Sequence, residues 1–268
     1  MMIKQTLFAL AGLSLLVAQS LKAAPLRIAA DPVPHAEILE YVKQIDPKLD
    51  LDIIELSGGV NANELLASGD VDANYFQHLP YLKDQEKALG KTFSVVADVH
   101  IEPLGIYSHR VKSLADLPQG ANIAVPNNTT NLSRALRLLE DKGLIHLKAL
   151  DNSGATLVTP QDITDNPKEI KIVEIESPQL PRALDDVDAA VINGNYALEA
   201  GLTPAKDALG LESAAHNPYG NLLVTTPQLA KDARIAQLAK DLTSPQVAAF
   251  IRQHYNGSVI PVTDEQHD

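Results

Sequence analysis

The side chains best suited to chemistry in this chain are an arginine and several asparagines that follow predicted strands. Asn131 and Arg134 open a predicted helix after the strand 122–125 and a polar turn. Asn131 is a typical N-cap, so free backbone N–H groups and the positive end of the helix dipole would face the sheet edge. With an arginine fork beside them, these groups favour binding of a carboxylate or phosphate. A surface ion pair of Arg134 with an acidic residue is an equal alternative.

Three rings, Phe76, His78 and Tyr81, lie close together in a chain whose aromatic content is only 4%. They follow a predicted strand at 72–76 and lie on a predicted loop. Rings gathered at a strand end indicate one wall of an apolar pocket, with core packing as the alternative.

More asparagines follow other predicted strands. Asn193 and Asn195 come after the strand 189–192, and Asn221 lies where the chain is expected to cross between two lobes. An asparagine amide both donates and accepts, which suits the ammonium and carboxylate of an amino acid. Turn formation explains each asparagine alone, but their shared position at strand ends favours a single binding cleft.

The sequence contains no recognisable catalytic constellation. It lacks the Gly-x-Ser-x-Gly elbow and any glycine-rich phosphate loop, and its eight histidines never lie three or four residues apart. We therefore predict no catalytic residue, no metal ligand and no cofactor. Two alternatives stay open: an enzyme that uses His78 with Glu102 or Asp31 as acid and base, and a metal-capture protein that uses scattered histidines.

The hydrophobic pattern predicts an α/β fold in two lobes. Strand 26–30, a helix from His35 to Pro47 and strand 51–56 form a βαβ unit, which implies a parallel sheet. The same order returns with strand 122–125, helix 132–142 and strand 170–174. Helices 227–241 and 245–255 are expected to pack on the first lobe. The predicted division is residues 24–104 plus 222–268 for the first lobe and 105–221 for the second.

The first 23 residues read as a secretory signal peptide. Lys4 precedes a short apolar run, and small residues at Ala23 and Ala24 provide a cleavage site, with cutting expected after Ala23. The chain has no cysteine, so it has no disulfide and no thiol for lipid attachment. Its formal net charge of −12 argues against nucleic acid and anionic membranes as partners. We expect an exported, non-lipidated periplasmic protein, with anchoring by an uncleaved signal helix as the alternative.

At these residues the chain resembles the methionine-binding proteins of bacterial ABC importers, the NlpA/MetQ family. The resemblance covers nearly the whole mature length, and it is the order and spacing of the matching segments that makes it specific. These segments are Pro-His-Ala-Glu-Ile at 34–38, Phe-Gln-His-x-Pro-Tyr-Leu at 76–82, Glu-Pro-Leu-Gly-Ile-Tyr-Ser at 102–108, Val-Pro-Asn at 125–127 with Asn-x-x-Arg-Ala-Leu at 131–136, Ala-Val-Ile-Asn at 190–193 and Pro-Tyr-x-Asn-Leu at 218–222.

The resemblance implies a two-lobed periplasmic binding protein fold with two crossover strands, 102–108 and 217–224, and the ligand in the interlobe cleft. It implies a methionine-like small molecule as ligand, delivered to a membrane permease by a protein that closes around it. Independently of the resemblance, we expect a monomer. The roles it implies are ligand carboxylate binding by Arg134, hydrogen bonds to the α-amino and carboxylate groups from Asn221 and Asn193, support from Asn131 and Asn195, and enclosure of the side chain by Phe76, His78 and Tyr81.

Two departures from the family pattern matter. The family usually carries a lipid-bearing cysteine, which this chain lacks. Gly59 stands where the family commonly has a tyrosine that touches the ligand side chain, so we expect a roomier pocket here. A methionine derivative, a short peptide or another sulfur-containing acid is then as acceptable as methionine.

Overall fold

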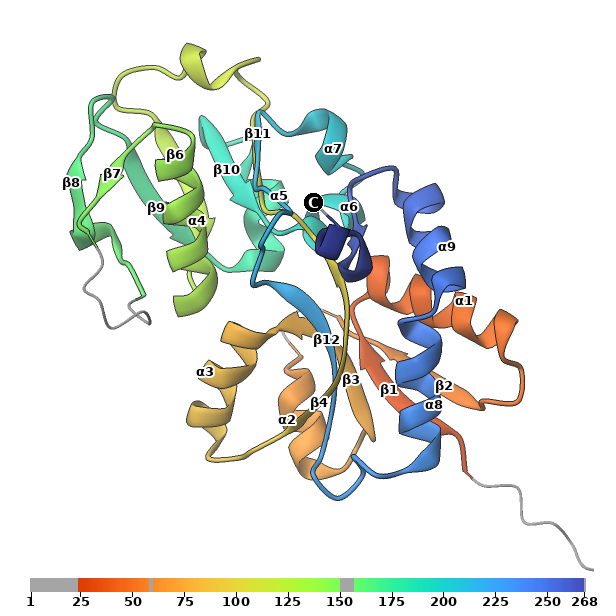
Figure 1. Ribbon diagram of the computed structural model, residues 1–268. Coiled ribbons are helices and arrows are strands. Elements are labelled where there is room, and N and C mark those ends of the chain that lie inside the picture. Colours follow the sequence, from red (N-terminus) through yellow and green to blue (C-terminus); the bar gives the residue numbers. More distant parts are fainter. Residues whose placement is uncertain (1–23, 58–59, 150–156, 268) are drawn as a thin grey trace, which may run out of the picture.

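The computed structural model describes residues 24–57, 60–149 and 157–267, and these form two α/β lobes (Figure 1). The predicted signal peptide and Gly59 lie outside the described residues. Within the described ranges, no helix combines the length and apolar character needed to cross a membrane.

The first lobe contains a six-stranded mixed sheet. Its strands are β1 (Leu26–Ala30), β2 (Leu51–Glu55), β3 (Ala73–His78), β4 (Ser94–Ile101), β12 (Gly220–Thr225) and β13 (Ile260–Pro261). They lie in the order β13-β4-β12-β3-β1-β2. β1 is parallel to β2 and β3, whereas β12 is antiparallel to β3 and β4. The predicted βαβ unit is therefore present as β1 and β2 with the helix between them.

Helices cover this sheet because each presents one apolar face. They are α1 (Glu37–Ile45), α2 (Ala62–Ser68), α3 (Leu79–Leu89), α8 (Ala233–Leu242) and α9 (Pro245–Tyr255). In α1, Ile38, Leu39 and Val42 are buried together with side chains of α8 and α9 in one core cluster. The two C-terminal helices thus pack on the first lobe, as predicted. α8 begins later than predicted because Asp232 caps it, accepting a hydrogen bond from the backbone N–H of Arg234 at 2.8 Å.

The second lobe contains a five-stranded sheet in the order β11-β5-β10-β6-β9 and a two-stranded sheet, β7-β8. Its strands are β5 (Gly105–Tyr107), β6 (Asn122–Pro126), β7 (His146–Leu147), β8 (Ile163–Asp165), β9 (Lys171–Ile175), β10 (Ala189–Ile192) and β11 (Gly210–Leu211), and its helices are α4 (Thr129–Asp141), α5 (Leu180–Ala183), α6 (Gly194–Glu199) and α7 (Pro204–Asp207). β6 is parallel to β9 and β10, so the second lobe repeats the parallel arrangement of the first.

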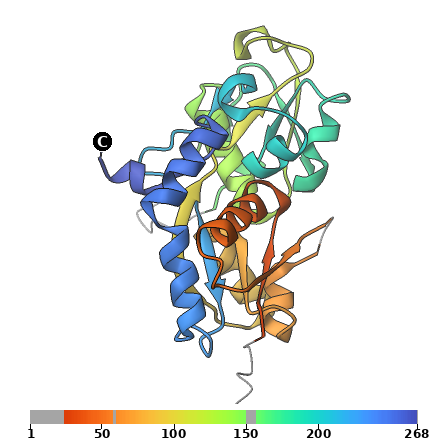
Figure 2. The same cartoon turned by 90° about the vertical axis from the view of Figure 1, so that its right-hand side faces the viewer.

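Two segments join the lobes. The chain passes from β4 to β5 through Glu102, and it returns from β11 to β12 through residues 212–219. α9 extends beside the junction in both views (Figures 1 and 2), and just beyond its end Ser258 accepts a hydrogen bond from the backbone N–H of Ala205 in α7 at 3.3 Å. The predicted fold class, two α/β lobes with two crossovers, is confirmed.

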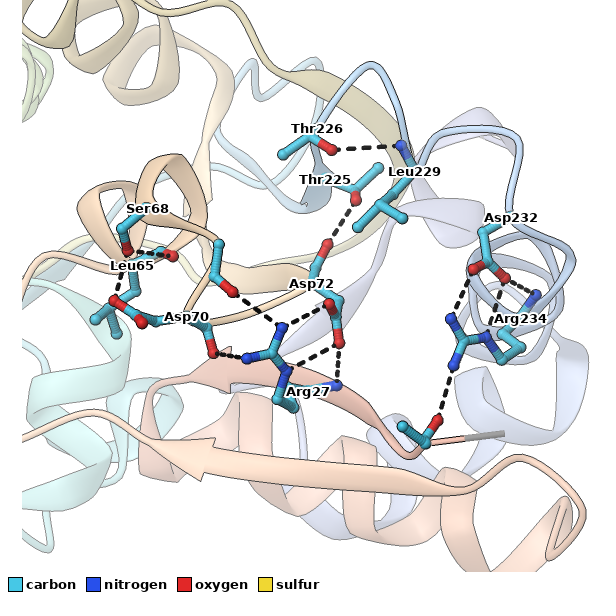
Figure 3. Close-up of polar contacts among 12 residues, drawn as sticks. Arg27, Leu65, Ser68, Asp70, Asp72, Thr225, Thr226, Leu229, Asp232 and Arg234 are labelled. Carbon is cyan, nitrogen blue, oxygen red and sulfur yellow. Dashed lines mark hydrogen bonds and ion pairs between the residues drawn. The ribbon is translucent and has the colours of Figure 1, made fainter. Parts of the chain in front are cut away.

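A polar cluster fixes the end of the first sheet that lies away from the second lobe (Figure 3). Arg27 in β1 donates to the backbone carbonyl of Asp70 at 2.7 Å and to the Asp72 carboxylate at 2.9 Å. Thr225 at the end of β12 donates to the carbonyl of Asp72 at 2.6 Å. These contacts tie β1, β12 and the turn before β3 together. The opposite ends of β1 and β3, where they face the second lobe, are thereby held on a rigid sheet.

Candidate functional site

A cavity of about 690 Å³ lies between the lobes, at the carboxyl ends of strands from both sheets. β1 ends before Asp31 and β3 ends at His78 in the first lobe, while β10 ends before Asn193 in the second. Ligands of open α/β sheets bind at this edge. All the predicted site residues that the structure describes line this cavity: Phe76, His78, Tyr81, Asn131, Arg134, Asn193, Asn195 and Asn221. Their roles toward a ligand stay predictions.

The helix that carries Arg134 begins earlier than the sequence suggested. Its N-cap is Asn128, whose side-chain oxygen accepts from the backbone N–H of Asn131 at 3.1 Å. The prediction that Asn131 caps the helix is therefore wrong, because Thr129 and Thr130 are already helical. Arg134 consequently lies in the second turn of α4 and reaches the cavity with its long side chain rather than from the first turn.

Arg134 is buried and forms a bidentate ion pair. Its Nε and Nη2 atoms lie 2.9 and 2.5 Å from the two carboxylate oxygens of Glu212, and Nη2 also donates to the carbonyl of Glu102 at 3.0 Å. The ring of Tyr219 lies 4.2 Å from the guanidinium carbon. Burial alone would raise the pKa of Glu212, but the Arg134 charge holds it below its ordinary value. The acidic partner of Arg134 is thus in the hinge, not on the surface.

His78 joins the two lobes through a defined tautomer. It ends β3 and caps α3, where its Nδ1 accepts from the backbone N–H of Tyr81 at 3.1 Å. The ring proton therefore lies on Nε2, which donates across the cavity to Oδ1 of Asn131 at 3.0 Å. Burial lowers the pKa of His78 to about 3, with the Arg134 charge adding to the effect, so the ring is neutral at neutral pH. The loop predicted around His78 is in fact the start of a helix, since Pro80 fits a first helical turn.

Asn131 is fully engaged within the protein. Its Oδ1 accepts from His78 and, at 3.3 Å, from Nδ2 of Asn193, while its Nδ2 donates to Asn128 at 3.0 Å. Each polar atom of the side chain therefore has at least one partner within the protein, and the supporting role predicted for Asn131 stays a prediction.

Two further cleft asparagines, Asn193 and Asn221, each have one amide atom unoccupied by the described residues. Oδ1 of Asn193 is buried and has no hydrogen-bond partner. Oδ1 of Asn221 accepts from Nε2 of His35 at 2.9 Å, which leaves the Nδ2 group of Asn221 to donate. Asn193 therefore presents an acceptor and Asn221 a donor, an arrangement that matches an ammonium and a carboxylate.

Aromatic rings form one side of the cavity. Phe76 and Tyr81 pack edge to face with their centroids 6.0 Å apart, and His78 packs against Tyr81 at 6.2 Å. Tyr219 contacts His78 at 5.0 Å, and Tyr196 lines the cavity from the second lobe. The predicted trio is thus placed together, with Tyr196 in the same lining and Tyr219 packed against His78.

Behind the cavity lies a buried network of histidines and one carboxylate. Oε1 of Glu102 lies 3.2 Å from Nε2 of His35 and 2.7 Å from Nε2 of His100, and the Tyr75 hydroxyl contacts Nδ1 of His100. Burial lowers the pKa of His35 to about 4 and that of His100 to about 3, so both rings are neutral at neutral pH. Nε2 of His100 donates to Glu102, whereas Nε2 of His35 donates to Oδ1 of Asn221. Among the described residues, these three are the ones whose ligand atoms are close enough, within 4.8 Å, to hold a metal ion. Hydrogen bonding accounts for the same contacts without a metal.

The acid–base pairs considered as an enzyme alternative are not hydrogen-bonded in the described structure. His78 bonds to Asn131 and the Tyr81 backbone, whereas Glu102 bonds to His35 and His100. Asp31 accepts from Nδ2 of Asn195 at 2.9 Å instead.

Sequence reasoning also missed how Asp31, Glu102 and Glu212 build the site. The sequence could have identified Asp31, because it is a polar residue directly after a strand, as the asparagines are. No sequence pattern indicated Glu212, because only folding brings its segment against α4.

Comparisons with known proteins found a matching family, curated relatives and similar solved structures. The family described as NlpA lipoprotein matches residues 26–263. The D-methionine-binding lipoprotein MetQ of Escherichia coli (strain K12) is 41% identical over 227 residues, which are 84% of this chain and 82% of that protein. A solved nutrient binding protein from Burkholderia cenocepacia bound to methionine superposes with a TM-score of 0.84 at 42% identity, covering 88% of this chain and 99% of that one. A periplasmic substrate-binding protein of an ABC transporter from Coxiella burnetii gives 0.82 at 40% identity, covering 88% and 100%.

These findings correct one prediction. We expected a non-lipidated protein free in the periplasm, but the matching family and the Escherichia coli relative are both described as lipoproteins. That expectation rested on the absence of cysteine from the 268 residues. The absence of one residue type was not sufficient ground for the location.

Proposed function

The chain belongs to the NlpA lipoprotein family, and we propose that it is the substrate-binding component of an ABC importer, taking methionine or a related amino-acid derivative. The named relatives support this proposal, since they are described as methionine-binding or as substrate-binding proteins rather than as enzymes.

One observation carries the proposal: the cavity offers donors and acceptors in the pattern of an amino-acid zwitterion. Nη1 of Arg134 bonds to no residue in the described part of the chain, and Nδ2 of Asn221 is likewise left to donate. These groups suit the ligand carboxylate. The buried, unpartnered Oδ1 of Asn193 suits the ligand ammonium.

The rest of the cavity fits a side chain of some size. Phe76, His78 and Tyr81 would enclose it through apolar and ring contacts. A volume of about 690 Å³ leaves room for a methionine derivative or a short peptide as well as for methionine.

Ligand binding would stabilise closure of the lobes. His78 and Asn131 already bridge them, as do Asp31 and Asn195. A ligand held by both lobes adds contacts that only the closed form makes, so it shifts the equilibrium toward closure. We propose that the closed, monomeric form is the one that the membrane permease recognises.

The test is identification of the ligand that purifies with the protein. The protein is denatured, and the released small molecules are identified by mass spectrometry. Methionine, a methionine derivative or a short peptide in stoichiometric amount supports the proposal. A stoichiometric ligand with neither an α-amino nor a carboxylate group would contradict it.

A further inference from the structure

Asp31 is a buried carboxylate that lines the cavity and has no cationic partner within the described ranges. It follows β1 directly and is 9% exposed. Its Oδ2 atom accepts from Nδ2 of Asn195, in the opposite lobe, at 2.9 Å. No lysine, arginine or histidine of the described residues forms an ion pair with it. A buried carboxylate with a single amide donor is under-solvated, since an ionised carboxylate has several acceptor positions.

The groups around Asp31 disfavour the ionised form of its carboxyl group. Glu102 from the crossover segment and Glu199 from α6 are acidic, and Tyr81 from α3 and Tyr196 from α6 line the same cavity. Burial raises the pKa of Asp31 to about 7, and the Glu102 charge adds to this. A positive charge beside Asp31 would stabilise the carboxylate and so lower its pKa, against the effects of burial and of the Glu102 charge.

The cavity also has more carboxylates than guanidinium groups in its lining. Its lining includes the carboxylates of Asp31, Glu102, Glu176 and Glu199, against the guanidinium groups of Arg134 and Arg182. The charge of Arg134 is already matched by Glu212. Oδ1 of Asn193, a second acceptor in the same lining, is buried without a donor. Asp31 and Asn193 thus each keep an acceptor position that no described residue fills.

We propose that Asp31 is a specificity-determining residue of the cleft, the counter-ion for a cationic group on the ligand. This inference rests on the proposed function and narrows the ligand class to molecules with a positive group placed against Asp31. The cation is either the α-ammonium of an amino acid or an onium group on its side chain. Tyr81 and Tyr196 line the same cavity, and aromatic rings add favourable contacts to either kind of cation.

The test compares three probes by calorimetry: L-methionine, S-methyl-L-methionine with its side-chain sulfonium, and 4-(methylthio)butanoate, which lacks the amino group. The variant is Asp31→Asn, which removes the charge but keeps an oxygen that can accept from Asn195. Asn195→Ala is the matched control, because it removes the interlobe hydrogen bond and keeps the charge.

If the α-ammonium is the cation, Asp31→Asn weakens both amino acids about tenfold or more and leaves 4-(methylthio)butanoate unchanged or tighter. If the side chain carries the cation, only S-methyl-L-methionine is weakened. Either pattern supports the inference. Equal weakening of all three probes, matching Asn195→Ala, overturns it and leaves Asp31 as an interlobe contact alone. Failure of the wild type to bind any probe would overturn the proposed function and this inference together.

A readout on the wild type keeps the inference testable should Asp31→Asn not fold. Titrations at pH 7 in two buffers of different ionisation enthalpy measure the protons released on binding. A cation against Asp31 drives it to the carboxylate, so we expect release of about half a proton per ligand. Binding of an amino-acid probe without proton release overturns the inference.

Discussion

Arg134 and Glu212 connect α4 of the second lobe to both segments that join the lobes. Glu212 lies on the returning segment, and its Oε2 atom also accepts from the backbone N–H of Leu104 at 3.1 Å, beside the outgoing segment. Arg134 donates to the carbonyl of Glu102 on that same outgoing segment at 3.0 Å. The residue proposed to bind the ligand carboxylate is thus part of the hinge, so ligand binding and lobe closure share one side chain.

Replacing Arg134 should harm both folding and binding. Arg134→Ala leaves Glu212 buried without its cation, which costs about 3–5 kcal/mol of unfolding free energy. Arg134→Lys keeps the charge but loses the bidentate geometry, so its loss should be smaller. Urea unfolding and calorimetry with L-methionine measure the two effects. Wild-type stability and affinity in Arg134→Ala would rule out the role assigned to this residue.

Gly194 should be intolerant of any side chain. A Cβ atom placed there would lie 2.7 Å from Cβ of Glu102, across the junction of the lobes. Gly194→Ala should therefore hinder closure, weakening ligand binding about tenfold or more and leaving a larger radius of gyration in small-angle scattering with ligand. Lys206→Ala, at an exposed position of α7, is the control. Equal affinity and equal radius in Gly194→Ala and this control would exclude the proposed close packing.

His78 should contribute to loss of stability in acid. The pKa of His78 is about 3 in the folded protein, below the ordinary value near 6.5. Between pH 3 and pH 6.5 the unfolded chain therefore binds a proton at His78 that the folded protein does not bind. The full contribution of neutral His78 to the free energy of unfolding is therefore present above pH 6.5, and it is lost as the pH falls from 6.5 toward 3. His78→Gln should lose less unfolding free energy than the wild type between pH 7 and pH 4. His146→Gln, at an exposed position, is the control, and equal losses in both variants would contradict the prediction.

Asp31 should act in the opposite sense. Its folded pKa of about 7 lies above the ordinary value near 4, so the folded protein is penalised increasingly as the pH rises between these values. Asp31→Asn should therefore stabilise the ligand-free protein more at pH 8 than at pH 4. Thermal unfolding at the two pH values measures this, and an identical difference at both would show that the carboxylate charge is not the cause.

Much of the fold follows from short-range patterns. The apolar spacing of Ile38, Leu39 and Val42 predicts α1, and Pro245 with Tyr255 bounds α9 as expected. Boundaries that depend on a particular cap were misplaced. Asn128 rather than Asn131 starts α4, and Asp232 delays α8, because several adjacent polar residues could serve as caps and only tertiary packing selects one.

The residues that line the cavity were more predictable from the sequence than the hydrogen bonds and ion pairs that join them. Strand ends followed by polar residues identify the asparagines that line the cavity, since parallel strands share one carboxyl edge. The contacts that decide which amide atoms remain for a ligand involve distant partners, such as His35 with Asn221 and Glu212 with Arg134. No local pattern encodes such pairs, because their members are 186 and 78 residues apart in the sequence and meet only in the folded chain.

Calorimetric titration of the ligand-free protein with L-methionine, followed by D-methionine, tests the central claim most directly. The account predicts saturable binding of one methionine per chain, lost in Arg134→Ala, at a site between the lobes. Absence of binding by folded wild-type protein to methionine and its derivatives, or binding that Arg134→Ala leaves intact, would contradict it.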